Sequence, residues 1–81
     1  MGANLVGANL VGANMRMARL NRANLSDCNL QDAKLQGANM DGARLDGANL
    51  KNATFDGATV WPKDFDATEH GAVYIQPKMA F

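Results

Sequence analysis

Few residues of this chain belong to the types that perform nucleophilic catalysis. It has one cysteine, one histidine and one serine, namely Cys28, His70 and Ser26. A nucleophile needs a base within hydrogen-bond reach and a third group that orients the base. We expect Cys28 to point into the protein interior, Ser26 to lie on an outer wall and His70 to lie in a separate C-terminal segment. The sequence therefore predicts no catalytic site and no enzymatic activity.

One group of residues has the chemistry of metal ligands: Asp64, Asp66, Glu69 and His70. Carboxylate oxygens and an imidazole could bind a divalent ion if a turn brought them together. Their spacing matches no known metal-binding loop, and carboxylates in turns commonly accept hydrogen bonds from backbone amides. The glycines form no phosphate-binding loop, because they recur at intervals of five with apolar residues between them. We expect no metal site and no cofactor.

A five-residue repeat dominates the rest of the chain. Residues 23–35 show it clearly: a small residue, a polar residue, a large apolar residue and two more polar residues. The large residues recur without insertion or deletion at Leu5, Leu10, Met15, Leu20, Leu25, Leu30, Leu35, Met40, Leu45, Leu50, Phe55 and Val60. Alanine stands two positions before each of them, except where Cys28 replaces it. Such a repeat must be interpreted before any single helix or strand is assigned.

A period of five fits neither an α-helix nor a straight strand. Residues five apart on a helix are rotated by roughly 140°, so the large residues would form no apolar face. On a strand, every second one would point to the opposite side. The large residues can share one interior only if the backbone changes direction once per pentad. Successive coils then stack about 4.8 Å apart and exchange backbone hydrogen bonds, so the sequence predicts an all-β solenoid.

The polar positions fit such corners. Asparagine tolerates turn conformations and bonds its own nearby backbone, and it precedes the large residue at Asn4, Asn9, Asn14, Asn24, Asn29, Asn39 and Asn49. Glycine adopts backbone conformations that other residues avoid, and we expect it at corners at Gly7, Gly12, Gly37, Gly42, Gly47 and Gly57.

The pattern Ala-[Asn/Arg/Lys/Thr]-[Leu/Met/Phe]-x-x resembles that of the pentapeptide-repeat proteins. The resemblance covers residues 3–60, which are twelve consecutive pentads. It implies a right-handed quadrilateral β-helix with four pentapeptides per coil, and therefore about three coils. Residues twenty apart would then stack on one another. The period of five is the part that the sequence itself shows.

The repeat ends after Val60, where Trp61-Pro62 removes a backbone donor and fixes a dihedral angle. Four of the five aromatic residues lie in residues 61–81. Because solenoid ends need a cover, we divide the chain into a β-helix, residues 1–60, and a C-terminal capping segment, residues 61–81. The stretch 59–66, with Gly71-Ala72 beyond it, resembles the ending of several cyanobacterial pentapeptide-repeat proteins.

Charge and hydropathy narrow the classes of partner. Eight basic and eight acidic residues give a formal net charge of zero, so general attraction to nucleic acid or an anionic membrane is not expected. One cysteine excludes an intrachain disulfide. The chain shows no signal peptide and no apolar run of the ~20 residues that a membrane helix needs. We expect a cytoplasmic protein, unless a targeting segment precedes this sequence.

The first coil is the least polar on its outside and offers a candidate interaction surface. Val6 and Val11 are expected to face outward, Met17 occupies a corner, and three arginines follow with no acid before Asp27. The candidate surface consists of Val6, Val11, Arg16, Met17, Arg19 and Arg22. The alternative interpretation is scattered surface apolar residues and solvated charge.

Met1 and Gly2 occupy the last two places of a pentad, so nothing in this sequence covers the first coil. Either that end pairs with another copy, or more repeats precede it. The function we expect is a protein-interaction or scaffold module with a protein partner, and the alternative is a homodimer that stacks through its N-terminal coil. Some family members mimic DNA and bind type II topoisomerases. This chain is neutral and short, with no dimerising helix in evidence, which argues against that role.

Overall fold

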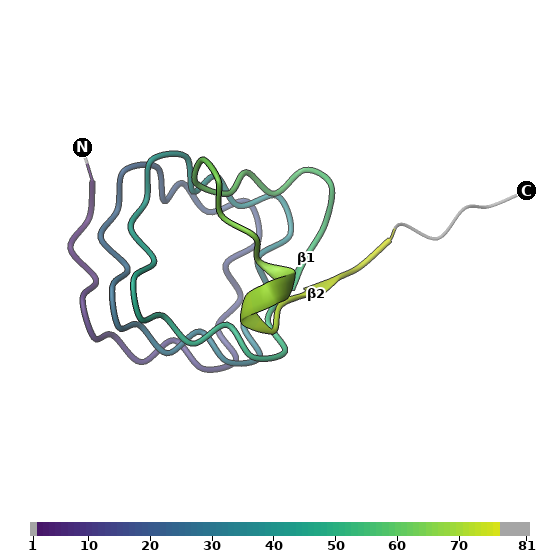
Figure 1. Ribbon diagram of the computed structural model, residues 1–81, viewed down its shortest axis with the longest axis horizontal. Coiled ribbons are helices and arrows are strands. Elements are labelled where there is room, and N and C mark those ends of the chain that lie inside the picture. Colours follow the sequence, from purple (N-terminus) through teal and green to yellow (C-terminus); the bar gives the residue numbers. More distant parts are fainter. Residues whose placement is uncertain (1, 77–81) are drawn as a thin grey trace, which may run out of the picture.

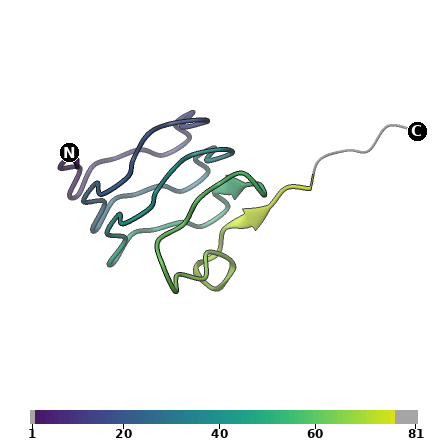
Figure 2. The ribbon, with the colours of Figure 1, turned by 90° about the horizontal axis from the view of Figure 1, so that it is seen from above.

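The computed structural model describes residues 2–76, and the chain winds as a solenoid (Figure 1). Isolated parallel bridges join residues twenty apart, starting with Asn4–Asn24 and Asn9–Asn29 and ending with Lys34–Thr54. The backbone therefore returns beside itself after four pentads. Figure 2 shows the resulting layers stacked along the solenoid axis. We call residues 3–22 the first layer, 23–42 the second and 43–60 the third. The predicted all-β solenoid is confirmed.

Tight turns form the corners. In each regular corner the N–H of the alanine, or of Cys28 in its place, donates to the carbonyl of the preceding large residue, as Ala8 does to Leu5 at 3.0 Å. Only the second corner residue has a positive φ, as in type II turns, which favour glycine there. Glycine fills that place at Gly7, Gly12, Gly37, Gly42 and Gly47. Other residues are forced into the same conformation at Met17, Arg22, Asp27, Asp32 and Asn52.

Backbone hydrogen bonds hold neighbouring layers together. For example, Leu25 N–H donates to Arg44 O at 2.8 Å, and Arg44 N–H donates to Ala23 O at 2.9 Å. The asparagines behave as the sequence predicted, because each accepts a hydrogen bond from the backbone two residues on. The bonded pairs are Asn4–Val6, Asn9–Val11, Asn14–Arg16, Asn24–Ser26, Asn29–Gln31, Asn39–Asp41 and Asn49–Lys51.

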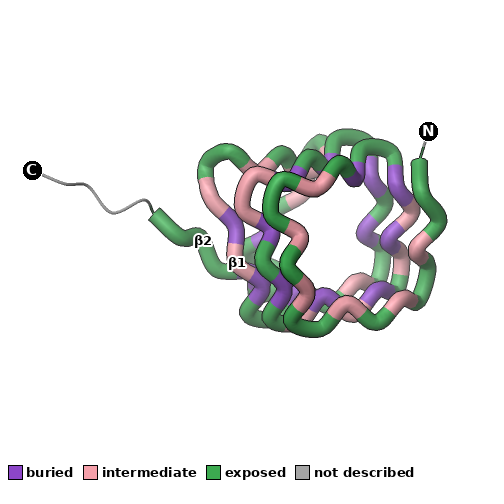
Figure 3. Tube along the Cα trace, turned by 180° about the vertical axis from the view of Figure 1, so that it is seen from behind, coloured by how far each residue is buried: buried purple, intermediate pink, exposed green. Residues whose placement is uncertain are grey.

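The core runs along the inside of the solenoid (Figure 3). Leu25, Leu30, Leu35 and Met40 of the second layer are 0% exposed. Alanines and Cys28 fill the space beside them, as expected where small and large residues alternate in a narrow interior. The large residues of the first layer before Leu20 are only partly buried.

The prediction that Val60 is the twelfth inward residue is wrong. Val60 is 45% exposed and pairs with Asn39, so it stands where other pentads have their outward polar residue. Trp61 instead packs against the core. One extra residue therefore enters the chain between Phe55 and Trp61, and the periodicity of the structure ends before that of the sequence.

A side-chain network accommodates this extra residue. In the regular layers the second corner N–H donates to a backbone carbonyl of the next layer, as Met17 does to Gln36. Gly37 N–H donates instead to Asp56 Oδ1 at 3.1 Å and to Thr59 Oγ1 at 3.2 Å. Thr59 Oγ1 in turn donates to Leu35 O at 2.8 Å. Gly57, predicted as a corner glycine, lies in this turn without a positive φ.

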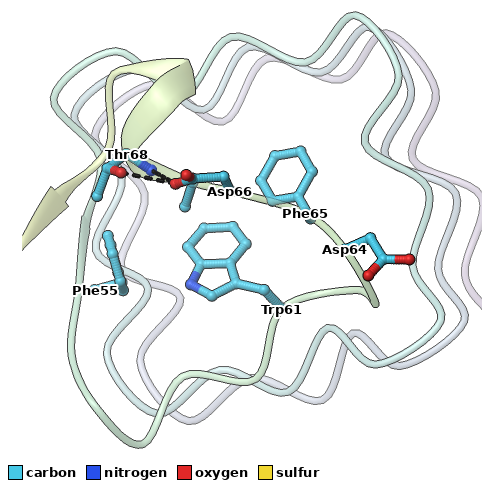
Figure 4. Close-up of a pocket in the computed structure, with 7 residues that line it drawn as sticks. Phe55, Trp61, Asp64, Phe65, Asp66 and Thr68 are labelled. Carbon is cyan, nitrogen blue, oxygen red and sulfur yellow. Dashed lines mark hydrogen bonds between the residues drawn. The ribbon is translucent and has the colours of Figure 1, made fainter.

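The remaining elements are short. Strand β1 (Thr54–Phe55) pairs in parallel with β2 (Val73–Tyr74), and the 3-10 helix η1 (Thr68–His70) precedes β2. Residues 61–76, here called the C-terminal segment, run across the end of the third layer (Figure 4). Trp61 meets Phe55 edge-to-face with ring centroids 5.2 Å apart, and Phe65 stacks on Trp61 at 5.5 Å. Residues 77–81, which belong to the predicted capping segment, lie outside the described residues.

Candidate functional site

The structure places the six predicted surface residues on the outside of the first layer, but on two opposite walls. Val6 and Val11 stand at the two corners that bound the wall of residues 8–10, and they are 50% and 49% exposed. Their N–H groups are held by Asn4 and Asn9, each at 3.2 Å. Since corners and walls alternate along the chain, this geometry follows from the pentad itself. The two valines therefore flank one wall.

The arginines lie along the opposite wall. Arg19 stands in the middle of residues 18–20 and bridges to Asn39, while Arg16 and Arg22 stand at the corners on either side. All three are exposed. Met17, 76% exposed with φ 62°, shares the corner of Arg16. The sequence located these residues on the surface, but the apolar pair and the basic group form two separate surfaces.

The wall between the valines carries a row of amides. Asn9, Asn29 and Asn49 stack in successive layers, because Asn9 bridges to Asn29 and Asn29 to Asn49. Each side-chain oxygen already accepts a backbone hydrogen bond. The amide nitrogens remain as a regular row of potential donors. A partner that meets this wall would therefore find donors between two apolar corners.

Cys28 has the environment of a packed core residue. It is 1% exposed, and its Sγ donates to Leu5 O at 2.7 Å. Burial is the largest cause that raises the pKa of the Cys28 thiol above its ordinary 9.0. A reactive cysteine needs a lowered pKa and access to solvent. Its surroundings therefore fit packing and not nucleophilic attack.

Among Asp64, Asp66, Glu69 and His70, which have the chemistry of metal ligands, Asp66 and His70 make other contacts in the structure. Within residues 2–76, no three His, Cys, Asp or Glu side chains lie close enough together to hold an ion. Asp66 Oδ1 instead accepts hydrogen bonds from Thr68 Oγ1 at 2.7 Å and Thr68 N–H at 3.1 Å. The bond from the Thr68 hydroxyl is the largest cause that lowers the pKa of Asp66. His70 stacks on Phe65 at 4.7 Å.

Two hollows lie beside the C-terminal segment. The first, about 390 Å³, is lined by Phe55, Trp61 and residues 64–68 (Figure 4). The second, about 490 Å³, is lined by residues 43–47 of the third layer together with Pro62, Phe65 and neighbouring residues of the segment. No sequence signal indicated either hollow, because both depend on how residues 61–76 fold back over the third layer.

No described helix is both long and apolar enough to cross a membrane. The fold and its surfaces define a class of repeat protein: a β-solenoid in which most pentads direct a small residue and a large apolar residue toward the interior. The family model for pentapeptide repeats matches residues 2–27 and 23–60 in eight copies. The chain belongs to the pentapeptide-repeat family.

A solved structure supports the same assignment. The chain is similar to alr5209, a pentapeptide repeat protein from Nostoc Pcc 7120, with 29% sequence identity and a TM-score of 0.63. The likeness covers 91% of this chain and 78% of that one. No curated protein matches.

Proposed function

We propose that this pentapeptide-repeat protein is a non-enzymatic module that binds a protein partner, built as a right-handed quadrilateral β-helix of about three coils. The observation that carries the proposal is the wall of the first layer bounded by Val6 and Val11. Ser26 and Gln31 occupy the corners of the second layer that correspond to Val6 and Val11, and both are polar. The first layer therefore differs from the second, because it carries a half-exposed valine at both corners of this wall, where an apolar partner surface could pack.

The chemistry of that wall suits a protein surface. Interface cores are apolar and poor in charged residues, and direct hydrogen bonds supplement the apolar contact. The valines supply the apolar part and the amides of Asn9 and Asn29 supply donors between them. No ionisable side chain lies at 6, 9 or 11, so a partner would lose no hydration of charge there. The opposite, arginine-bearing wall would require an acidic partner.

Affinity capture with the whole protein tests the proposal. Val6→Asp and Val11→Asp place a charge on each corner without touching the core, so capture of the partner should fall at least tenfold while circular dichroism stays unchanged. Arg19→Asp, on the opposite wall, is the matched control and should capture as the parent does. Equal capture by all three variants would place the contact elsewhere. A complete lack of saturable partners across several extracts would refute the proposal.

Light scattering on the same samples separates binding from self-association. A partner-binding module stays at the mass of one chain until the partner is added. A mass of two chains that falls to one in Val6→Asp would instead show that this wall joins two copies.

A further inference from the structure

The strand edge at residues 43–47 is open at the end of the third layer. Among residues 2–76, the N–H groups of Leu45 and Gly47 and the carbonyl of Ala43 form no hydrogen bond. Backbone donors and acceptors that no other strand satisfies are a ready template for an added strand. This edge therefore has the capacity to bind an extended backbone.

The layer below shows the geometry that such a strand would take. Leu25 N–H donates to Arg44 O and Asp27 N–H donates to Asp46 O, both at 2.8 Å. Arg44 N–H donates to Ala23 O at 2.9 Å. Residues 23–27 and 43–47 share the same pentad positions, so the edge of 43–47 presents the same two donors and one acceptor. An incoming strand would lie parallel to it.

Space for that strand exists. The hollow of about 490 Å³ is lined by all five residues 43–47 and, from the C-terminal segment, by Pro62, Lys63, Asp64, Phe65 and His70. Figure 4 shows Phe65 and Asp64 on the stretch that follows Trp61, across the end of the solenoid. We call this hollow the groove. It lies between the strand edge of residues 43–47 and the part of the C-terminal segment that carries Phe65.

The neighbouring walls of the third layer are engaged by the C-terminal segment. Asn52 N–H donates to Gly71 O at 2.9 Å, and β2 pairs with β1. The segment therefore blocks the docking of a complete layer from a second copy. A single extended chain is the occupant that the remaining space admits.

We propose that residues 43–47 bind an extended segment of a partner protein by strand addition, with the sequence order acidic, apolar, basic. The acidic residue would donate its N–H to Ala43 O, accept from Leu45 N–H and place its carboxylate beside exposed Arg44. The apolar side chain points inward onto Leu45 and Phe65. The basic residue accepts from Gly47 N–H and lies beside Asp46. Main-chain bonds supply affinity and the alternate side chains supply specificity.

This inference goes beyond the proposed function, because it assigns a second site at the opposite end of the solenoid and a different mode of recognition. The wall of Val6 and Val11 binds a folded surface, whereas the groove binds an unfolded segment. Each can fail without the other, since their residues lie in the first and third layers.

The test uses the full chain labelled with ¹⁵N and a capped hexapeptide, Gly-Ala-Glu-Leu-Lys-Gly. Saturating peptide should slow hydrogen exchange at the amides of Leu45 and Gly47 at least tenfold, and should leave Leu25, already bonded, unchanged. N-methylation of the glutamate nitrogen removes the donor to Ala43 O and should weaken binding at least tenfold. Saturable binding without protection at Leu45 and Gly47 would overturn the proposal, as would the absence of binding.

Charge reversal tests the order of side chains. Arg44→Glu should abolish the preference of the parent for the original peptide over Gly-Ala-Lys-Leu-Glu-Gly, because the new carboxylate favours a basic first residue while Asp46 still favours a basic third one. Arg19→Glu changes the same kind of outward position on another wall and should keep the original preference. Val6→Asp should also bind the peptide as the parent does. An unchanged preference in Arg44→Glu would refute the proposed orientation in the groove.

Discussion

Substitutions at Val60 and Trp61 distinguish the structural register from the sequence repeat. If the five-residue period continued to its end, Val60 would be buried and Trp61 would start an outer loop. In the structure Val60 is 45% exposed, and Trp61 packs against the core beside Phe55. We therefore compare Val60→Thr, which keeps the shape and the strand preference, with Trp61→Ala.

The expected free energies of unfolding differ clearly. Substitutions of exposed residues usually change stability by less than about 0.5 kcal/mol, which we expect for Val60→Thr. Loss of a buried Trp side chain costs about 3–5 kcal/mol. Trp61 is only partly buried, so we expect the lower end of that range, about 3 kcal/mol. In the opposite register, a threonine hydroxyl buried without a partner would cost about 1–3 kcal/mol.

Urea denaturation gives the free energy of unfolding of both variants. Far-ultraviolet circular dichroism is the readout, because Trp61→Ala removes the tryptophan that fluorescence would follow. With a slope of about 1 kcal/mol/M for a small protein, Trp61→Ala should move the midpoint down by about 3 M. Trp61→Phe, which keeps a ring against Phe55, is the control and should lose less than half as much. A large loss for Val60→Thr with little loss for Trp61→Ala would refute the structural register.

Four further predictions concern single positions. Leu30→Ala should lower the free energy of unfolding by about 3–5 kcal/mol, and Leu10→Ala, at a partly buried position of the same column, by less than half of that; equal losses in urea denaturation would contradict this burial. Met17→Gly should raise stability by about 1 kcal/mol, because it relieves a left-handed backbone; a fall would contradict this. The pKa of Asp66 is lowered from 3.8, so its stabilising effect is present above pH 3.8 and is lost as the pH falls through the lowered pKa. The free energy of unfolding of Asp66→Asn should therefore fall less steeply at acid pH than that of the parent. An identical fall in both proteins would count against the hydrogen bond from Thr68. The pKa of Cys28 is raised from 9.0, so stability should fall as the pH rises above 9.0, and Cys28→Ala should abolish that slope; a slope that persists would assign it to other groups.

The five-residue period was enough to predict the solenoid, because it determines where the backbone bends and which side chains point inward. Leu25 and Leu30 are buried as expected, and Asn24 and Asn29 hold the corners that follow them. These features repeat every pentad, so neighbouring pentads support the same conclusion. Local chemistry and overall fold agree here.

The period failed where a local side-chain network overrides it. Asp56 and Thr59 replace backbone acceptors for Gly37, which allows an extra residue without breaking the ladder. The repeat pattern describes only the spacing of the large residues. It does not show where side-chain oxygens take the place of a backbone carbonyl as hydrogen-bond acceptors. The available signal was Pro62 after Trp61, because Asp-Gly pairs also stand at regular corners, as at Asp41-Gly42 and Asp46-Gly47.

Exposure of the candidate surface could be predicted from pentad position alone, as Val6 and Val11 show. Predicting that Val6 and Arg19 lie on opposite walls requires the number of pentads per layer. The five-residue period does not give that number. The groove beside residues 43–47 could not be predicted either. It depends on the placement of Phe65 and Pro62, which follow no repeat.

Scalar couplings across hydrogen bonds, detected by nuclear magnetic resonance, test the stacked layers most directly, because each coupling names one donor and one acceptor. Correlations should join the amide of Leu5 to the carbonyl of Asn24, that of Leu30 to Asn49, and that of Met40 to Val60. Correlations between residues four apart, as in a helix, or a partner other than Val60 for Met40, would contradict the architecture on which both proposed binding surfaces depend.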